Sequence, residues 1–286
     1  MTSPDRSRLR LFVGILVVCA IGLHLVSRVA EISPIALAPA YMFSPMVAGL
    51  VVCIRRDVPL ASAGLRLGRV RWLVVAALIA LPLVGLTLAV AVAVPGVGFD
   101  PTANPAPGLE LPSGFLGVLA TFGVVLGLGT TVNAIFAFGE EFGWRGYLLW
   151  ELAPWGFWKA SFAIGALWGV WHAPVIIAGY NYPSFPVIGV VTMTIACLSF
   201  SPVYTYLVVR AESVIAAALL HGVFNGSAGL VIAYAVTDGA VLSELVASPV
   251  GVAGVIAFGL AAAGIAVSRP PSLTREFAHE QTAPSP

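Results

Sequence analysis

Charged residues are scarce in this chain of 286 amino acids. Only 9% of the residues are charged, 59% are hydrophobic, and the mean hydropathy is +0.98. A soluble domain has roughly 45–50% apolar and about 25% charged residues, so this composition excludes an ordinary soluble protein. We predict an all-α fold, a polytopic membrane helix bundle with about eight transmembrane helices.

The chain also lacks a basic surface and a cysteine framework. Its net charge is +1, with no basic patch to neutralise a run of phosphates, which excludes a nucleic-acid partner. Cys19, Cys53 and Cys197 lie far apart inside apolar segments, without a C-x-x-C pair. They are typical of small buried hydrophobic residues rather than of disulfides.

Motifs of several protease classes are missing. The chain has no H-E-x-x-H, no Gly-x-Ser-Gly near a histidine and no membrane-embedded Gly-x-Gly-Asp. Ser227 follows His221 by six residues and lies on a different helix face. Serine and aspartate proteolysis are therefore disfavoured.

Apolar runs long enough to cross a hydrocarbon core of about 30 Å recur along the chain. The predicted spans are residues 9–29, 36–54, 72–94, 115–138, 158–178, 186–209, 213–235 and 245–267. The fourth is expected to continue as helix through an acidic motif. Residues 1–268 thus form a single integral-membrane domain, and the polar, proline-containing tail at 269–286 is expected to be cytoplasmic and disordered.

The basic residues indicate the orientation of the bundle, because short loops rich in Lys and Arg stay in the cytoplasm. With eight spans and a cytoplasmic N-terminus, every Lys and Arg except Arg28 falls on the cytoplasmic side, Arg145 among them. The near absence of lysine beside many arginines is typical of a GC-rich bacterial genome. We predict a multi-pass protein of a bacterial cytoplasmic membrane with both termini in the cytoplasm; whether the first span is cleaved as a signal peptide is left open.

One stretch, Gly139 to Arg145, places two carboxylates and a guanidinium beside an apolar run. A carboxylate at membrane depth costs roughly 2.5–3.5 kcal/mol on insertion scales, so it marks a functional site by default. Glu141 and Arg145 have the i,i+4 spacing of a helical ion pair, while Glu140 points about 100° away and is left free. The alternative is a solvated cap where the fourth helix meets the cytoplasm.

Two histidines can supply partners for Glu140. His172 lies in the fifth span ahead of Pro174, which removes a backbone donor and is expected to bend the helix and open a polar cavity. His221 and Asn225 are four residues apart and share a helix face in the seventh span. If the three helices are adjacent, these groups meet at one site with access from the cytoplasmic side.

Together these residues resemble the CPBP family of intramembrane proteases, which contains CAAX prenyl endopeptidases and bacteriocin-processing, Abi-like proteins. The three ordered motifs are Glu140-Glu141-x-x-x-Arg145, Trp168-x-x-x-His172 and His221-x-x-x-Asn225. The resemblance covers about residues 115–235, the catalytic half of the family's helical core. The aromatic residue of the second motif is commonly Phe in the family, and Trp168 adds an N–H that needs a partner.

The resemblance implies an intramembrane endopeptidase with a glutamate or metallo mechanism. Glu140 and His172 would activate a water for attack on a peptide carbonyl. His221 and Asn225 would stabilise the oxyanion, since donors aimed at a developing charge supply a large electrostatic contribution.

Supporting roles follow from the same resemblance. The ion pair of Glu141 and Arg145 would hold the backbone of the acidic motif in place, and Arg145 is available to attract a substrate carboxylate. Trp168 and Trp144 are expected in the pocket wall.

A cofactor is left undecided between none and a single divalent metal. Glu140, His172 and His221 could form a three-ligand open zinc site. Asn225 is a poor zinc ligand, and a metal-free glutamate mechanism fits the four residues as well, so we favour no metal.

Two other function classes stay open. A non-catalytic membrane scaffold or immunity protein of the same fold would carry the same residues. A transporter is less favoured, because the chain shows one polar cluster and no repeated pair of broken helices. The expected partners are the lipid bilayer and a membrane-associated protein or peptide substrate; the sequence leaves open whether that substrate is prenylated and which oligomeric state the protein adopts.

Overall fold

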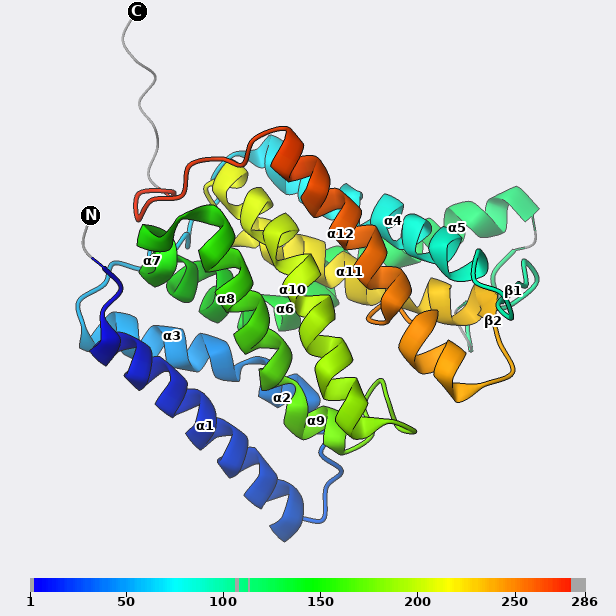
Figure 1. Cartoon of the computed structure of the whole chain (residues 1–286), viewed down its shortest axis with the longest axis horizontal. Helices are drawn as coiled ribbons and strands as arrows, with labels where there is room; N and C mark the ends of the chain where they lie inside the picture. The colour runs from blue at the N-terminus through cyan, green and yellow to red at the C-terminus, as the bar shows by residue number, and fades with distance from the viewer. Residues whose placement is uncertain (1–2, 106–107, 113, 279–286) are drawn as a thin grey trace, which may run out of the picture.

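The computed structural model describes residues 3–105, 108–112 and 114–278, which form a bundle of helices (Figure 1). Two short strands, β1 (Gly98–Phe99) and β2 (Ala235–Val236), pair antiparallel beside it. The predicted class, a polytopic helical membrane bundle, is confirmed.

Twelve α-helices make up the described part of the chain, and four shorter helical turns connect some of them. The α-helices are α1 (Arg6–Val29), α2 (Ala38–Met42), α3 (Ser44–Arg55), α4 (Val70–Val92), α5 (Gly114–Leu128), α6 (Ala134–Glu141), α7 (Leu149–Leu152), α8 (Gly156–Trp171), α9 (Ala173–Ile177), α10 (Pro186–Ala211), α11 (Ile215–Tyr234) and α12 (Val252–Val267). The turns are π-helical at Gly129–Asn133, Phe142–Leu148 and Val241–Val246 and 3-10 at Ala153–Trp155.

Six helical segments of the described residues are long and apolar enough to cross a membrane. The fourth of these, Gly114–Ile177, includes two of the predicted spans, and the last predicted span corresponds to the shorter apolar helix α12. The protein is therefore integral to the membrane, while eight as the exact number of spans stays a prediction.

The acidic motif lies on a continuous helical run, as expected. The π-helical turns at 129–133 and 142–148 join α5, α6 and α7 without a break. Such turns insert one residue into the helical repeat and are frequent at functional sites. The run ends at the 3-10 turn before Gly156, where a φ of 76° allows the chain to turn back as α8.

The bend predicted near Pro174 is present. α8 ends at Trp171, and α9 begins at Ala173 with Pro174 in its first turn. Because proline has no N–H, the helical hydrogen-bond ladder is interrupted at Pro174. Just before it, the N–H of His172 bonds to the carbonyl of Gly169 at 3.2 Å. His172 therefore sits at the junction of two helices.

Close helix packing brings the three motifs together. α10 packs against α8, α11 and α12, and α11 packs against α4 and α6 (Figure 1). A Cβ on Gly222 of α11 would lie 2.3 Å from the carbonyl oxygen of Gly129, so only glycine fits at this crossing. This contact fixes the position of His221, the neighbour of Gly222, relative to α6.

Both ends of the described chain meet at one end of the bundle, which we call the terminal end (Figure 1). The N–H of Asp5 and the guanidinium of Arg275 both donate to the buried carboxylate of Glu151, each at 2.7 Å. The linkers that follow α3 and α10 lie there too, because the N–H of Arg69 bonds to the carbonyl of Ala211 at 2.8 Å.

The C-terminal tail departs from its prediction. Residues 270–278 are packed against the terminal end, where Leu273 and Phe277 are buried and Arg66 donates to the carbonyl of Ala278. The expectation of disorder is wrong for this stretch, because its two apolar side chains and Arg275 find partners on the bundle. Residues 279–286 lie outside the described residues.

Candidate active site

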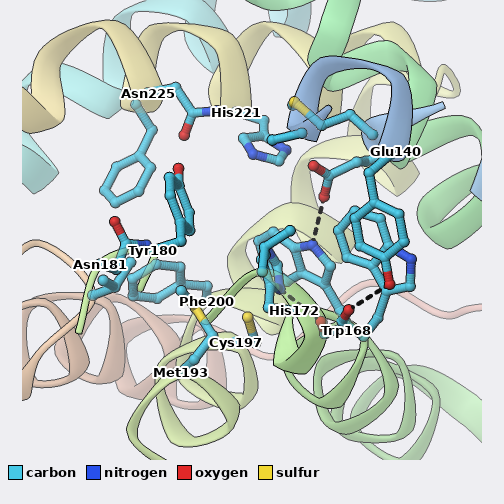
Figure 2. A pocket seen from close by; sticks show the side chains of 17 residues that line it. Glu140, Trp168, His172, Tyr180, Asn181, Met193, Cys197, Phe200, His221 and Asn225 are labelled. Atoms are coloured by element: carbon cyan, nitrogen blue, oxygen red, sulfur yellow. Dashed lines mark hydrogen bonds between the residues drawn. The ribbon is translucent and has the colours of Figure 1, made fainter. Parts of the chain in front are cut away.

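A cavity of about 100 Å³ lies among α6, α8, α10 and α11. Figure 2 shows Glu140, His172, His221 and Asn225 around it, on three separate segments of the chain. A water needs only about 10–15 Å³ of such space, so several waters fit. The tertiary structure thus brings together the four residues that the sequence marked as catalytic candidates.

Glu140 is held by an unforeseen contact. Its side chain is buried, and the indole N–H of Trp168 donates to its Oε2 at 2.7 Å (Figure 2). Oε1 has no hydrogen-bond partner among the described residues. The N–H that tryptophan adds is therefore satisfied by the carboxylate itself, and the second oxygen remains available to a water in the cavity.

Glu141 and Arg145 form the expected ion pair, with Nη1 of Arg145 3.1 Å from both carboxylate oxygens. The guanidinium also lies over the rings of Trp168, at 4.2 Å, and Tyr204, at 4.7 Å. Both charged side chains are fully buried. A solvated cap at the end of the fourth helix is therefore ruled out.

The buried position of Arg145 corrects two expectations. Arg145 is 0% exposed and does not line the cavity, so it is unavailable to a substrate carboxylate. It also lies inside the bundle rather than in a loop. It therefore does not count among the basic loop residues that indicate how the bundle is oriented in the membrane. Arg145 instead neutralises Glu141 behind the wall formed by Trp168.

His221 is oriented by Glu141. Its Nδ1 lies 2.8 Å from Oε1 of Glu141. A carboxylate paired with Arg145 is an acceptor, so Nδ1 must carry the hydrogen. In a neutral imidazole Nε2 is then an acceptor, and only the imidazolium offers a second N–H to a ligand.

His172 has a fixed tautomer for a similar reason. Its Nδ1 lies 2.8 Å from the carbonyl oxygen of Trp168, which can only accept, so Nδ1 is the donor. The neutral ring then presents the lone pair of Nε2. His172 is thereby suited to accept a hydrogen bond from a water.

Asn225 completes the polar part of the cavity. Its side chain is exposed, and its amide has no hydrogen-bond partner in the part of the chain that the structure describes. Tyr180 and Asn181, in the turn after α9, lie near it in the cavity wall (Figure 2). These two residues were not predicted; the only sequence signal is a polar and aromatic turn between two apolar runs.

Comparison with known families identifies the region that carries this site. Residues 120–227 match the family model described as type II CAAX prenyl endopeptidase Rce1-like. Residues 120–227 are similar to an Rce1-like domain. This match confirms the predicted kinship with CPBP intramembrane proteases and supports an intramembrane endopeptidase. No curated protein matches the chain.

Trp144 lies behind the cavity rather than in its wall. It is fully buried and packs edge-on against Phe12 of α1 and Trp171, with ring centroids 5.7 and 6.0 Å away. Trp171 occupies the expected place in the wall together with Trp168. The sequence could not reveal that Trp171 rather than Trp144 lies in the wall, because this depends on how the π-helical turn at 142–148 rotates the helix.

The donor set of the cavity does not fit a three-ligand zinc site. Among the described residues, no three His, Cys, Asp or Glu side chains are placed to hold one metal ion. Glu140 is directed to the indole of Trp168, and His221 is directed to Glu141. We therefore derive no step through a metal.

Part of the cavity rim lies in segments far from the terminal end. The outer rim contains Tyr180, which is 40% exposed, and the partly exposed Ala38, Asn181 and Val250. These residues lie at the start of α2, after α9 and before α12, in segments at the other end of the bundle (Figure 1). This part of the rim is therefore remote from the terminal end, while access from the cytoplasmic side stays a prediction.

Proposed function

We propose that the protein is an intramembrane endopeptidase that hydrolyses a peptide bond of a membrane-associated substrate. One observation carries the proposal: Glu140 and His172 line one cavity, which has room for several waters. Each presents an atom that has no hydrogen-bond partner among the residues that the structure describes, Oε1 of Glu140 and Nε2 of His172. A water placed between these atoms would be polarised as a nucleophile.

The reaction follows from these groups. The water oxygen attacks the carbonyl carbon of the scissile bond, and its proton passes to Glu140. The tetrahedral intermediate then collapses, the C–N bond breaks, and Glu140 returns the proton to the leaving nitrogen. Hydrolysis consumes one water and leaves the carboxyl group as it began.

His221 and Asn225 would stabilise the oxyanion of the intermediate. The Asn225 amide supplies one N–H, and His221 supplies Nε2–H only as an imidazolium, since Nδ1–H is used by Glu141. Glu141 therefore acts as a positioning residue for His221. Arg145 and Trp168 serve the same purpose, because they hold Glu141 and Glu140 respectively.

Isosteric replacement of the carboxyl group tests this mechanism. The purified protein, reconstituted in lipid vesicles, is expected to cleave a membrane-anchored peptide. Glu140→Gln should lower kcat by about 10²- to 10⁴-fold, because the amide cannot take a proton. Glu276→Gln, which removes an exposed carboxylate at the terminal end, is the matched control and should keep full activity.

Two outcomes would contradict the proposal. Equal activity in Glu140→Gln and in the parent would exclude Glu140 as the base. A folded parent protein that cleaves no membrane-anchored peptide would favour a non-catalytic scaffold of the same fold.

A further inference from the structure

The rim of the cavity includes connecting segments from one end of the bundle. Tyr180 and Asn181 belong to the turn between α9 and α10, and Val250 to the segment before α12. The hydroxyl of Tyr182 donates to the carbonyl of Val250 at 2.7 Å and ties these two segments together. A substrate reaches the site past this rim.

The opposite wall of the cavity is closed. Arg145, Tyr204 and Val214 are all 0% exposed, and the N–H of Val214 bonds to the carbonyl of Gly64 in the linker after α3 at 3.0 Å. The guanidinium of Arg145 is packed over the rings of Trp168 and Tyr204 and paired with Glu141. The part of the cavity wall formed by Trp168 is therefore backed by a buried ion pair.

The two ends of the bundle also differ in charge. Apart from Arg28, at the far end of α1, and the buried Arg145, every Lys and Arg of the chain lies in or next to the segments of the terminal end. The other end carries Asp100, Glu110 and Glu244 instead. Because Lys- and Arg-rich short segments stay in the cytoplasm, this distribution places the terminal end there.

We propose that the active site is entered from the non-cytoplasmic side of the membrane. The substrate class would then be a membrane-anchored peptide whose scissile bond lies in, or just beyond, the non-cytoplasmic leaflet. The side of access follows from the cavity and the charges alone, while cleavage of such a peptide rests on the proposed function.

The lining of the cavity further restricts the substrate. It contains no Lys or Arg among the described residues, and its inner walls include the apolar Met193, Phe200 and Phe224. Apart from His221, whose imidazolium the proposed mechanism uses for the oxyanion, a free C-terminal carboxylate at the scissile bond would find no cation there, and desolvating it without a partner is costly. We expect an internal peptide bond flanked by apolar side chains.

Labelling with a membrane-impermeant thiol reagent tests the side of access. Tyr180→Cys places a thiol on the rim, and Ser272→Cys places one at an exposed position of the terminal end. In intact spheroplasts, Tyr180→Cys should be labelled above the parent and Ser272→Cys should not; permeabilisation should expose Ser272→Cys. The parent chain, which retains Cys19, Cys53 and Cys197, gives the background.

The reverse labelling pattern would overturn the proposal. So would a Tyr180→Cys protein that remains unlabelled after permeabilisation, because the rim would then be closed. Neither result depends on catalysis, so the side of access is tested separately from the proposed function.

A pair of substrates tests the substrate class. Each carries one apolar cleavage sequence next to a single transmembrane helix, on the cytoplasmic side in one and on the other side in its partner. Cleavage of only the non-cytoplasmic version, lost in Glu140→Gln, is expected. Cleavage of only the cytoplasmic version would overturn the inference. If neither is cleaved while labelling follows the expected pattern, the proposed endopeptidase function fails and the side of access stands.

Discussion

Trp168 donates its indole N–H to Oε2 of Glu140 at 2.7 Å, and the same ring carries the guanidinium of Arg145 on its face at 4.2 Å. Arg145 pairs with Glu141, which in turn orients His221. One tryptophan thus contacts both the carboxylate proposed as the base and the ion pair that positions the proposed oxyanion donor. A phenylalanine would supply the ring but not the N–H.

Trp168→Phe isolates that hydrogen bond. A hydrogen bond to a charged group contributes roughly 1.5–3 kcal/mol, so kcat/KM is expected to fall about 10- to 100-fold while the aromatic packing is kept. The acidic limb of the pH profile of kcat/KM should move to higher pH, because the lost donor favoured the ionised carboxylate. Initial rates across a pH series provide the measurement.

The control for this variant is Trp158→Phe, which changes a partly exposed tryptophan stacked on Phe162, away from the cavity. It should leave both the rate and the pH profile unchanged. A Trp168→Phe protein with a lower rate but an unmoved profile would show that Trp168 acts only through packing.

Glu141→Gln should lower both the stability of the protein and its peptide-cleavage activity. The substitution leaves the fully buried Arg145 without its counter-charge, which typically costs about 3–5 kcal/mol. Combining it with Arg145→Met removes the unpaired charge, so thermal unfolding in detergent should recover toward the parent. Activity should remain low, since His221 still lacks its carboxylate. Full activity in the double variant would exclude a positioning role for Glu141.

Gly222→Ala tests the crossing of α11 and α6. The added Cβ would lie 2.3 Å from the carbonyl oxygen of Gly129 and must push the helices apart, at an expected cost of about 1–3 kcal/mol. His221 moves with Gly222, so activity should fall too. Gly259→Ala is the matched control, because no atom lies within 4 Å of its Cβ. Alanine there should be neutral or stabilising by up to about 1 kcal/mol.

Metal removal tests the preference for a metal-free mechanism. Prolonged treatment with a chelator should leave the rate of peptide cleavage unchanged, and elemental analysis of the purified protein should find far less than one equivalent of zinc. Loss of activity that added zinc restores would contradict the metal-free mechanism.

Local rules predicted a good part of this molecule from its sequence. The length and apolarity of the runs predict membrane helices because hydrocarbon has no partners for backbone polar groups. The helical repeat predicts that Glu141 pairs with Arg145 and that Glu140 points elsewhere, and the structure has this arrangement. Proline chemistry predicts the break beside His172. Each of these inferences needs only residues within a few positions of one another.

Only the tertiary structure decides what depends on helix rotation and packing. The bonds from Trp168 to Glu140 and from His221 to Glu141 join residues 28 and 80 positions apart. π-helical turns alter the angular repeat, and Trp144 consequently lies behind the cavity instead of in its wall. The side on which the cavity opens is likewise set by which loops cover it. The sequence by itself determines a membrane helix bundle and its candidate site residues, whereas long-range packing decides which side chain contacts which and where the cavity lies.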